Sequence, residues 1–110
     1  MKAPYYVFPG LKSMVVDIVT RNYGLNSEEL WKGQQRPKVE ARDTIFLLER
    51  IKGQTEQVIA DKYAIKRNTI HASLVRCRER LDTYPAELRR FAQLATQLEL
   101  KTEFQNYINQ

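Results

Sequence analysis

Apolar residues recur along most of the chain at the spacing of amphipathic α-helices. The first helical stripe comprises Val15, Val16, Ile18, Val19 and Tyr23. Gly24 follows this stripe as a typical C-cap. Asn26 or Ser27 can then cap a short helix whose buried side holds Leu30 and Trp31.

The middle of the chain has a longer and more apolar pattern. Segment 33–37 contains one Gly, one Pro and two Gln and predicts a loop, after which a long helix runs over 38–52. The apolar positions of this helix cover more than one face, so we expect it to be the central helix of the core. The pattern then predicts a short helix capped by Thr55, a second helix that ends near Thr83, and a last helix opened by Pro85.

These helices predict an all-α fold, a small multi-helix domain. A chain of 110 residues is long enough for one core and too short for two. We expect an N-terminal arm at 1–10, the helical domain at 11–99, and a C-terminal helical extension or tail at 100–110. The only strand signal, YYVF at 5–8, lies close to two prolines.

Residues 55–83 have the pattern of a helix-turn-helix. In its first helix, Val58 and Ile59 are expected to face the core. The second helix is expected to start near Asn68 or Thr69, and one of the two would cap it. Its core face consists of residues that fall within about 60° of one another at 100° per residue, namely Ile70, Leu74, Cys77 and Leu81. The outward face holds Asn68, Ala72, Val75 and Glu79.

Positive charge is concentrated in two segments. The formal net charge of the chain is +5. Segment 32–42 carries four basic residues against one acid, and segment 62–80 carries six against one, so the rest of the chain is net acidic. Such an asymmetry indicates a polyanionic partner, with two solvated helix faces as the plainer alternative.

The second helix of 55–83 carries residue types that suit DNA. In a DNA-binding helix-turn-helix, this helix enters the major groove with its N-terminal residues at the base edges. Asn holds adenine and Arg holds guanine in bidentate pairs, and Thr can contact a thymine methyl. The residues expected near base edges are Asn68, Thr69, His71, Ala72 and Arg76. The cations expected on phosphates are Lys62, Lys66, Arg67, Arg78 and Arg80.

Other chemistry has little support in the sequence. The single cysteine, Cys77, excludes an internal disulfide, and its place in the apolar stripe favours a core thiol over a nucleophile. His71 has no second His, Cys or paired carboxylate at a ligand or catalytic spacing, so we expect no enzyme, no metal site and no cofactor. No apolar run approaches the roughly 20 residues of a membrane span, and no secretory signal is recognisable, which favours a cytoplasmic protein.

Residues 14–50 contain several features in a fixed order. A helix precedes YGL at 23–25, SEELW at 27–31 joins an acidic pair to an aromatic residue, and a basic loop leads to VEAR at 39–42, which opens a long apolar helix. The helix-turn-helix continues the succession. This order resembles the C-terminal DNA-binding domain of the bacterial replication initiator DnaA. VEAR after a basic loop at this distance from YGL is the specific feature, since a helix-turn-helix alone occurs in many families.

The resemblance implies a Trp-repressor-like, all-helical domain that binds double-stranded DNA and acts in replication or transcription control at the nucleoid. It implies minor-groove or phosphate contacts by the basic loop through Lys32, Arg36 and Lys38, with Arg42 on a phosphate. Gln34 stands where the family has a minor-groove arginine. The base-readout positions that it implies are Lys66, Arg67, Asn68 and Thr69. Because initiator domains bind as single modules, it favours a monomer over a dimer.

Two departures from the family keep a second function open. The family has a glycine pair and a basic-Asp-His signature where this chain has residues 64–69, and only Thr69 is clearly kept. No G-x-x-x-x-G-K-[ST] motif occurs, so we expect no nucleotide binding. The alternative function is a protein-interaction adaptor that retains the helical fold, with Trp31, the aromatic N-terminus and the tail from Lys101 as docking surface.

Overall fold

The computed structural model describes residues 13–110, which form seven α-helices and no strand. The helices are α1 (Met14–Tyr23), α2 (Ser27–Leu30), α3 (Arg36–Ile51), α4 (Glu56–Tyr63), α5 (Arg67–Thr83), α6 (Pro85–Gln97) and α7 (Lys101–Ile108). The predicted all-α fold is therefore confirmed. The expected arm at 1–10 and the strand candidate at 5–8 lie outside the described residues.

Most helix ends follow the local chemistry of the sequence. Asn26 and Thr55 accept hydrogen bonds from first-turn amides of α2 and α4, as the capping preference predicts. Gly24 ends α1 in the left-handed conformation, with φ 67°. The long helix α3 begins at Arg36, two residues before the expected start, because Pro37 fits the first turn of a helix.

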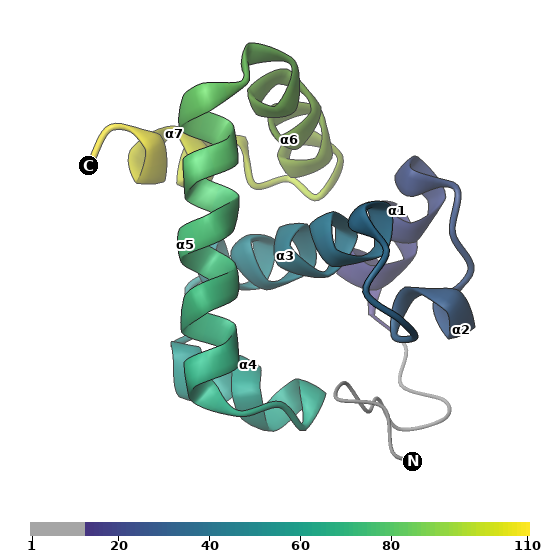
Figure 1. The fold of residues 1–110 in the computed structure, drawn as a ribbon. Coiled ribbons are helices and arrows are strands. Elements are labelled where there is room, and N and C mark those ends of the chain that lie inside the picture. Colours follow the sequence, from purple (N-terminus) through teal and green to yellow (C-terminus); the bar gives the residue numbers. More distant parts are fainter. Residues whose placement is uncertain (1–12) are drawn as a thin grey trace.

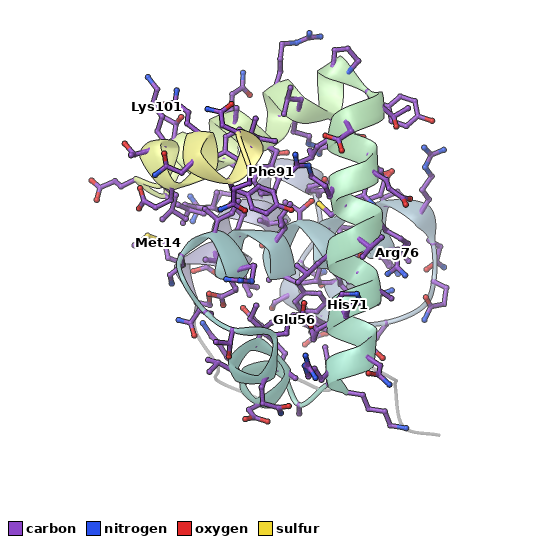
Figure 2. The ribbon with its side chains drawn as sticks, turned by 90° about the vertical axis from the view of Figure 1, so that its left-hand side faces the viewer. Met14, Glu56, His71, Arg76, Phe91 and Lys101 are labelled. Atoms are coloured by element: carbon purple, nitrogen blue, oxygen red, sulfur yellow. The ribbon has the colours of Figure 1, made fainter. Side chains whose placement is uncertain are left out.

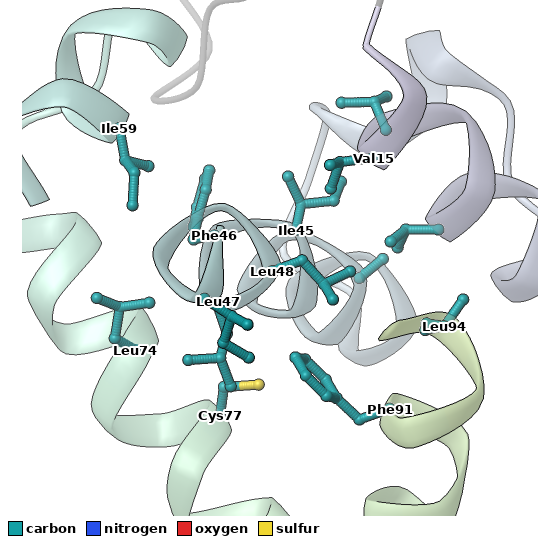
Figure 3. Close-up of a cluster of buried hydrophobic side chains, with 14 of the residues drawn as sticks. Val15, Ile45, Phe46, Leu47, Leu48, Ile59, Leu74, Cys77, Phe91 and Leu94 are labelled. Atoms are coloured by element: carbon teal, nitrogen blue, oxygen red, sulfur yellow. The ribbon is translucent and has the colours of Figure 1, made fainter. Parts of the chain in front are cut away.

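Helix α3 is the centre of the core, as predicted. Residues 41–49 and 51 of α3 are buried. Figure 3 shows apolar side chains of α1, α4, α5 and α6 arranged around it, including Ile59, Leu74 and Phe91. Trp31 and Leu30 are also buried, and the Trp31 ring centroid lies 5.5 Å from that of Tyr63. One core therefore joins α3 to both helices of the helix-turn-helix.

Helices α4 and α5 form the predicted helix-turn-helix, with corrections at two places. The expected core face of α5 is buried. Val58 is wrong as a core residue, since it is 46% exposed while its neighbour Ile59 is fully buried. The expectation that Asn68 or Thr69 caps α5 is also wrong. Lys66 is the N-cap residue and its carbonyl accepts from the amides of Thr69 and Ile70, so the helix starts earlier and includes both expected caps.

The C-terminal segment 100–110 is a packed helix. The backbone reverses at Glu99, which has φ 60°, and α7 then returns across α6 and α3, as Figure 1 shows. Leu100 and Phe104 are buried, and the Phe104 ring centroid lies 5.1 Å from that of Phe91. This segment therefore belongs to the same core as the helical domain expected at 11–99.

The two neighbours on α4 provide a test of the fold. Ile59→Ala should lower the free energy of unfolding by about 2–5 kcal/mol, because it leaves a cavity against α3. Val58→Ala should change it by less than about 0.5 kcal/mol, because that side chain faces solvent. Urea denaturation of both variants measures the contrast. Equal losses of unfolding free energy in the two variants would contradict the orientation of α4.

Candidate nucleic-acid interface

The N-terminal half of α5 presents the outward residues that the sequence predicted. Asn68, Ala72 and Val75 are exposed. Among the described residues, no side-chain hydrogen bond caps the start of α5. Within residues 13–110, the side chains of Lys66 and Asn68 take part in no hydrogen bond or ion pair of the fold. This end of α5 therefore offers an ammonium, an amide and a small apolar surface to a partner.

One flank of α5 is tied to a buried carboxylate of α3. The side chain of Asp43 is almost fully buried, and its oxygens accept hydrogen bonds from Ser73, Arg76 and Arg80. The donor atoms of Arg76 lie 3.0 and 3.2 Å from the carboxylate, and Nη1 of Arg80 lies 3.1 Å from it. Two guanidinium groups face a single carboxylate, so this flank keeps a positive charge.

The same contacts continue along α3 toward the basic loop. Nη2 of Arg80 donates to the carbonyl of Glu40 at 3.4 Å, and the Glu40 carboxylate pairs with Arg36 at 3.1 Å. Contacts therefore connect Arg36 to Arg76 through Glu40, Arg80 and Asp43. Arg36 precedes Asp43 by seven residues, about 10 Å along the helix. Figure 1 shows the loop before α3 at the N-terminal end of that helix, to one side of α5.

Arg42 stabilises this loop from inside, and its expected phosphate contact is wrong. The residue is only 1% exposed. Its guanidinium donates to the carbonyls of Leu30 at 3.2 Å and Gly33 at 3.0 Å, and to Oε1 of Gln34 at 3.4 Å. Gln34 is thereby engaged with Arg42. In the loop that Arg42 holds, Lys32 is exposed. In the first turn of α3, which follows the loop, Arg36 is exposed and Lys38 is partly exposed.

The opposite flank of α5 faces a carboxylate of α4. Oε2 of Glu56 lies 3.0 Å from Nδ1 of His71, and Oε1 lies 3.7 Å from Nε of Arg67. In Figure 2, His71 lies on the side of α5 that faces Glu56, and Arg76 lies on the other side of the ribbon. The predicted readout residues are therefore divided between two flanks, with Asn68 and Ala72 between them.

Three predicted phosphate contacts are engaged inside the protein. Arg78 pairs with Asp82 at 3.1 Å and donates to the carbonyls of Tyr107 and Ile108, so it caps the end of α7. Arg80 is 17% exposed at its side chain and bonds Asp43. Lys62 lies 2.6 Å from the buried carboxylate of Glu49. Their sequence pattern was that of exposed helical cations. Apart from Asp82, one turn after Arg78, their internal partners come from distant segments.

Glu49 connects α3 to α4 as Asp43 connects it to α5. The hydroxyl of Tyr63 donates to Oε2 of Glu49 at 2.6 Å, and the ammonium of Lys52 lies 3.6 Å from Oε1. Burial, followed by the contact with Glu49, raises the pKa of Tyr63 far above its usual value, so the phenol remains a donor. The helix-turn-helix is thus held by two carboxylates of one helix.

Cys77 lies in the core, as its place in the apolar stripe predicts. Burial raises the pKa of Cys77 to about 12, so the thiol is protonated and unreactive at neutral pH, in agreement with a core thiol. Residues 13–110 contain no group of three His, Cys, Asp or Glu side chains placed to hold a metal ion. Within the same range, none of the helices combines the length and hydrophobicity that a membrane span requires.

Sequence patterns did not identify the acids that organise the interface. Asp43 lies 30 residues from Ser73 and 37 from Arg80, and Glu56 lies 15 from His71. The available signal was the spacing of Ser73, Arg76 and Arg80 along one flank of α5, together with an aspartate in the helix predicted to be the centre of the core. No family model matches the chain, and comparisons with curated proteins and with solved structures also find no match.

Asp43→Asn should destabilise the protein by roughly 3 kcal/mol, because two guanidinium groups lose the buried charge that they share. Glu79→Gln is the matched control on α5, where an exposed acid should contribute less than about 0.5 kcal/mol. Chemical denaturation gives both values. An Asp43→Asn variant as stable as the wild type would show that the carboxylate does not fix α5.

Proposed function

We propose that the protein binds double-stranded DNA, with α5 in the major groove and the loop before α3 on the adjacent backbone or minor groove. The supporting observation is the line of contacts that joins Arg36 to Arg76, beside an α5 end where Lys66 and Asn68 have no partner within residues 13–110. Along α3, Arg36 next to the basic loop lies about 10 Å from Asp43, the residue that bonds α5. Since the major groove is about 12 Å wide, this offset suits the phosphates that border the groove.

The internal contacts reduce the predicted set of DNA-binding residues. Arg42, Lys62, Arg78 and Arg80 are engaged in the fold and are withdrawn from the proposal. The phosphate contacts retained from the prediction are Lys32, Arg36, Lys38 and Lys66. Arg76 was predicted near base edges, and because its side chain is still 46% exposed beside Asp43, we assign it to a phosphate. Asn68, Thr69 and Ala72 remain as base-reading residues, with Asn68 suited to adenine. Arg67 and His71, which were also predicted to read bases, face Glu56 and are left out of this set.

The resemblance to the initiator's DNA-binding domain supports a role in replication or transcription control at the nucleoid. Binding as a monomer follows from the same resemblance. No catalytic step, nucleotide or cofactor is part of this proposal.

The second candidate function is a protein-interaction adaptor, and a different observation favours it. Val75 on the outer face of α5 is 45% exposed, and Tyr84 after its end is also exposed. A shallow hollow beside Tyr84 is lined by Arg76, Glu79, Arg80 and Thr83. Exposed aromatic and apolar side chains next to arginine are frequent in protein interfaces.

Selection of bound duplexes from a random oligonucleotide pool, at two salt concentrations, distinguishes these functions. We expect an enriched motif, and affinity for it should fall with log salt at a slope of about −4.5 if the five retained cations each contact one phosphate. Failure to enrich any sequence, with an affinity that does not change with salt, would reject DNA binding in favour of the adaptor.

Two single variants test the division between reading and positioning. Asn68→Ala should lower discrimination by removing a base contact, at a cost of about 1–3 kcal/mol for the preferred site. Lys38→Ala should weaken all duplexes alike and reduce the salt slope by about 1. Titrations of the selected duplex and a scrambled one measure both effects. If Asn68→Ala, like Lys38→Ala, lost affinity equally for the selected and the scrambled duplex, the reading role of Asn68 would be contradicted.

A further inference from the structure

The two cations that begin α5 have different surroundings. Lys66 is exposed, and within the described residues its ammonium has no partner. Arg67, the next residue, is 63% exposed at its side chain and lies 3.7 Å from the carboxylate of Glu56. The same carboxylate lies 3.0 Å from His71, one turn further along α5. Neighbouring cations of the candidate interface therefore differ in how far their charge is already compensated.

Glu56 is held where it can act on both side chains. It is the first residue of α4, directly after the N-cap Thr55, and a negative charge is favoured at that end of a helix. Its side chain is partly buried, with 22% of its surface exposed, which limits its reorientation. Arg67 and His71 are four residues apart and so lie on the same flank of α5. The acid thus faces both of them from the adjacent helix.

We propose that Glu56 determines the specificity of DNA binding by compensating Arg67 and thereby withholding it from phosphates. This inference rests on the proposed function. Sequence-independent affinity comes from cations that displace counterions from DNA. Glu56 faces a single guanidinium group, that of Arg67, and so offsets this gain, whereas Glu40 and Asp43 together face three guanidinium groups and leave the other flank positive. Glu56 also repels any phosphate that approaches its flank. The part of the affinity for DNA that does not depend on sequence is therefore reduced. The base contacts of Asn68 and Ala72 then make up a larger share of the binding free energy.

The arrangement gives Lys66 and Arg67 unequal effects on binding. Lys66→Gln should reduce the salt slope for a scrambled duplex by about 1, because a phosphate contact is lost. Arg67→Gln should leave that slope unchanged in the otherwise wild-type protein. Glu56→Gln should steepen it by about 1 and tighten scrambled-duplex binding several-fold. The double variant of Glu56→Gln with Arg67→Gln should restore the wild-type slope, since the released cation is then absent.

The measurement is the dissociation constant of a scrambled and a selected duplex over a series of salt concentrations, for all four variants. Glu103→Gln on α7 is the control for net charge, because it removes one exposed acid from a helix that lies away from the start of α5, as Figure 1 shows. The thermal midpoint of Glu56→Gln is recorded as well. A structural role of Glu56 would change that midpoint without changing the salt slope of the folded protein.

The inference is overturned if Arg67→Gln reduces the slope as much as Lys66→Gln does. It is also overturned if Glu56→Gln leaves the slope unchanged, or if Glu103→Gln reproduces its effect. Failure of the proposed function would look different. The wild-type protein would then bind neither duplex in a salt-dependent manner, and Lys66→Gln would have no effect.

Discussion

The arrangement of the helix-turn-helix depends on two buried carboxylates of α3. Asp43 accepts hydrogen bonds only from α5 among the described residues, and Glu49 accepts them from Lys62 and Tyr63 of α4. A buried carboxylate costs several kcal/mol unless charged or polar groups compensate it, so both helices must stay in contact with α3. The apolar stripe of α5 determines which face of the helix is buried, but apolar packing is not directional. The donors to Asp43 oppose small rotations of α5 about its axis and so fix the orientation of its outward residues more closely.

The same ion pairs change the meaning of the positive charge in the sequence. The excess in segments 32–42 and 62–80 indicates a polyanionic partner only where the cations are accessible. Arg42 forms hydrogen bonds inside the loop, and Arg78 caps α7. The charge that a partner meets is therefore smaller and more localised than the sequence suggests. It is concentrated at the loop before α3 and at the start of α5, on the flank that includes Arg76.

The parts that the sequence predicted well are those decided by local chemistry. Helical spacing correctly identified Ile70 and Leu74 as core residues, and capping preferences identified Asn26 and Thr55. The wrong predictions depend on contacts between distant segments. Val58 has an apolar side chain but lies on the outer side of α4, because Ile59 and Tyr63 already occupy the contact with the core. At the start of α5, packing outweighed the capping preference of Asn and Thr.

The hydrogen bonds from Ser73 and Arg80 to Asp43 join residues 30 and 37 positions apart. Such contacts leave no periodic pattern in the sequence that could predict them.

The two flanks of α5 make the candidate interface asymmetric. The flank that bears Arg76 continues through Arg80 and Glu40 to the basic loop, and the other flank ends at Glu56, which compensates Arg67. Attraction to a polyanion therefore acts on one side of the helix. A duplex lying against α5 would be drawn toward the loop, so both elements would contact the same molecule, and the helix would be oriented without a second protomer. For the proposed binding of DNA, this asymmetry is a physical reason for a single protein molecule to lie on the duplex in one direction, which a symmetric distribution of cations around α5 could not provide.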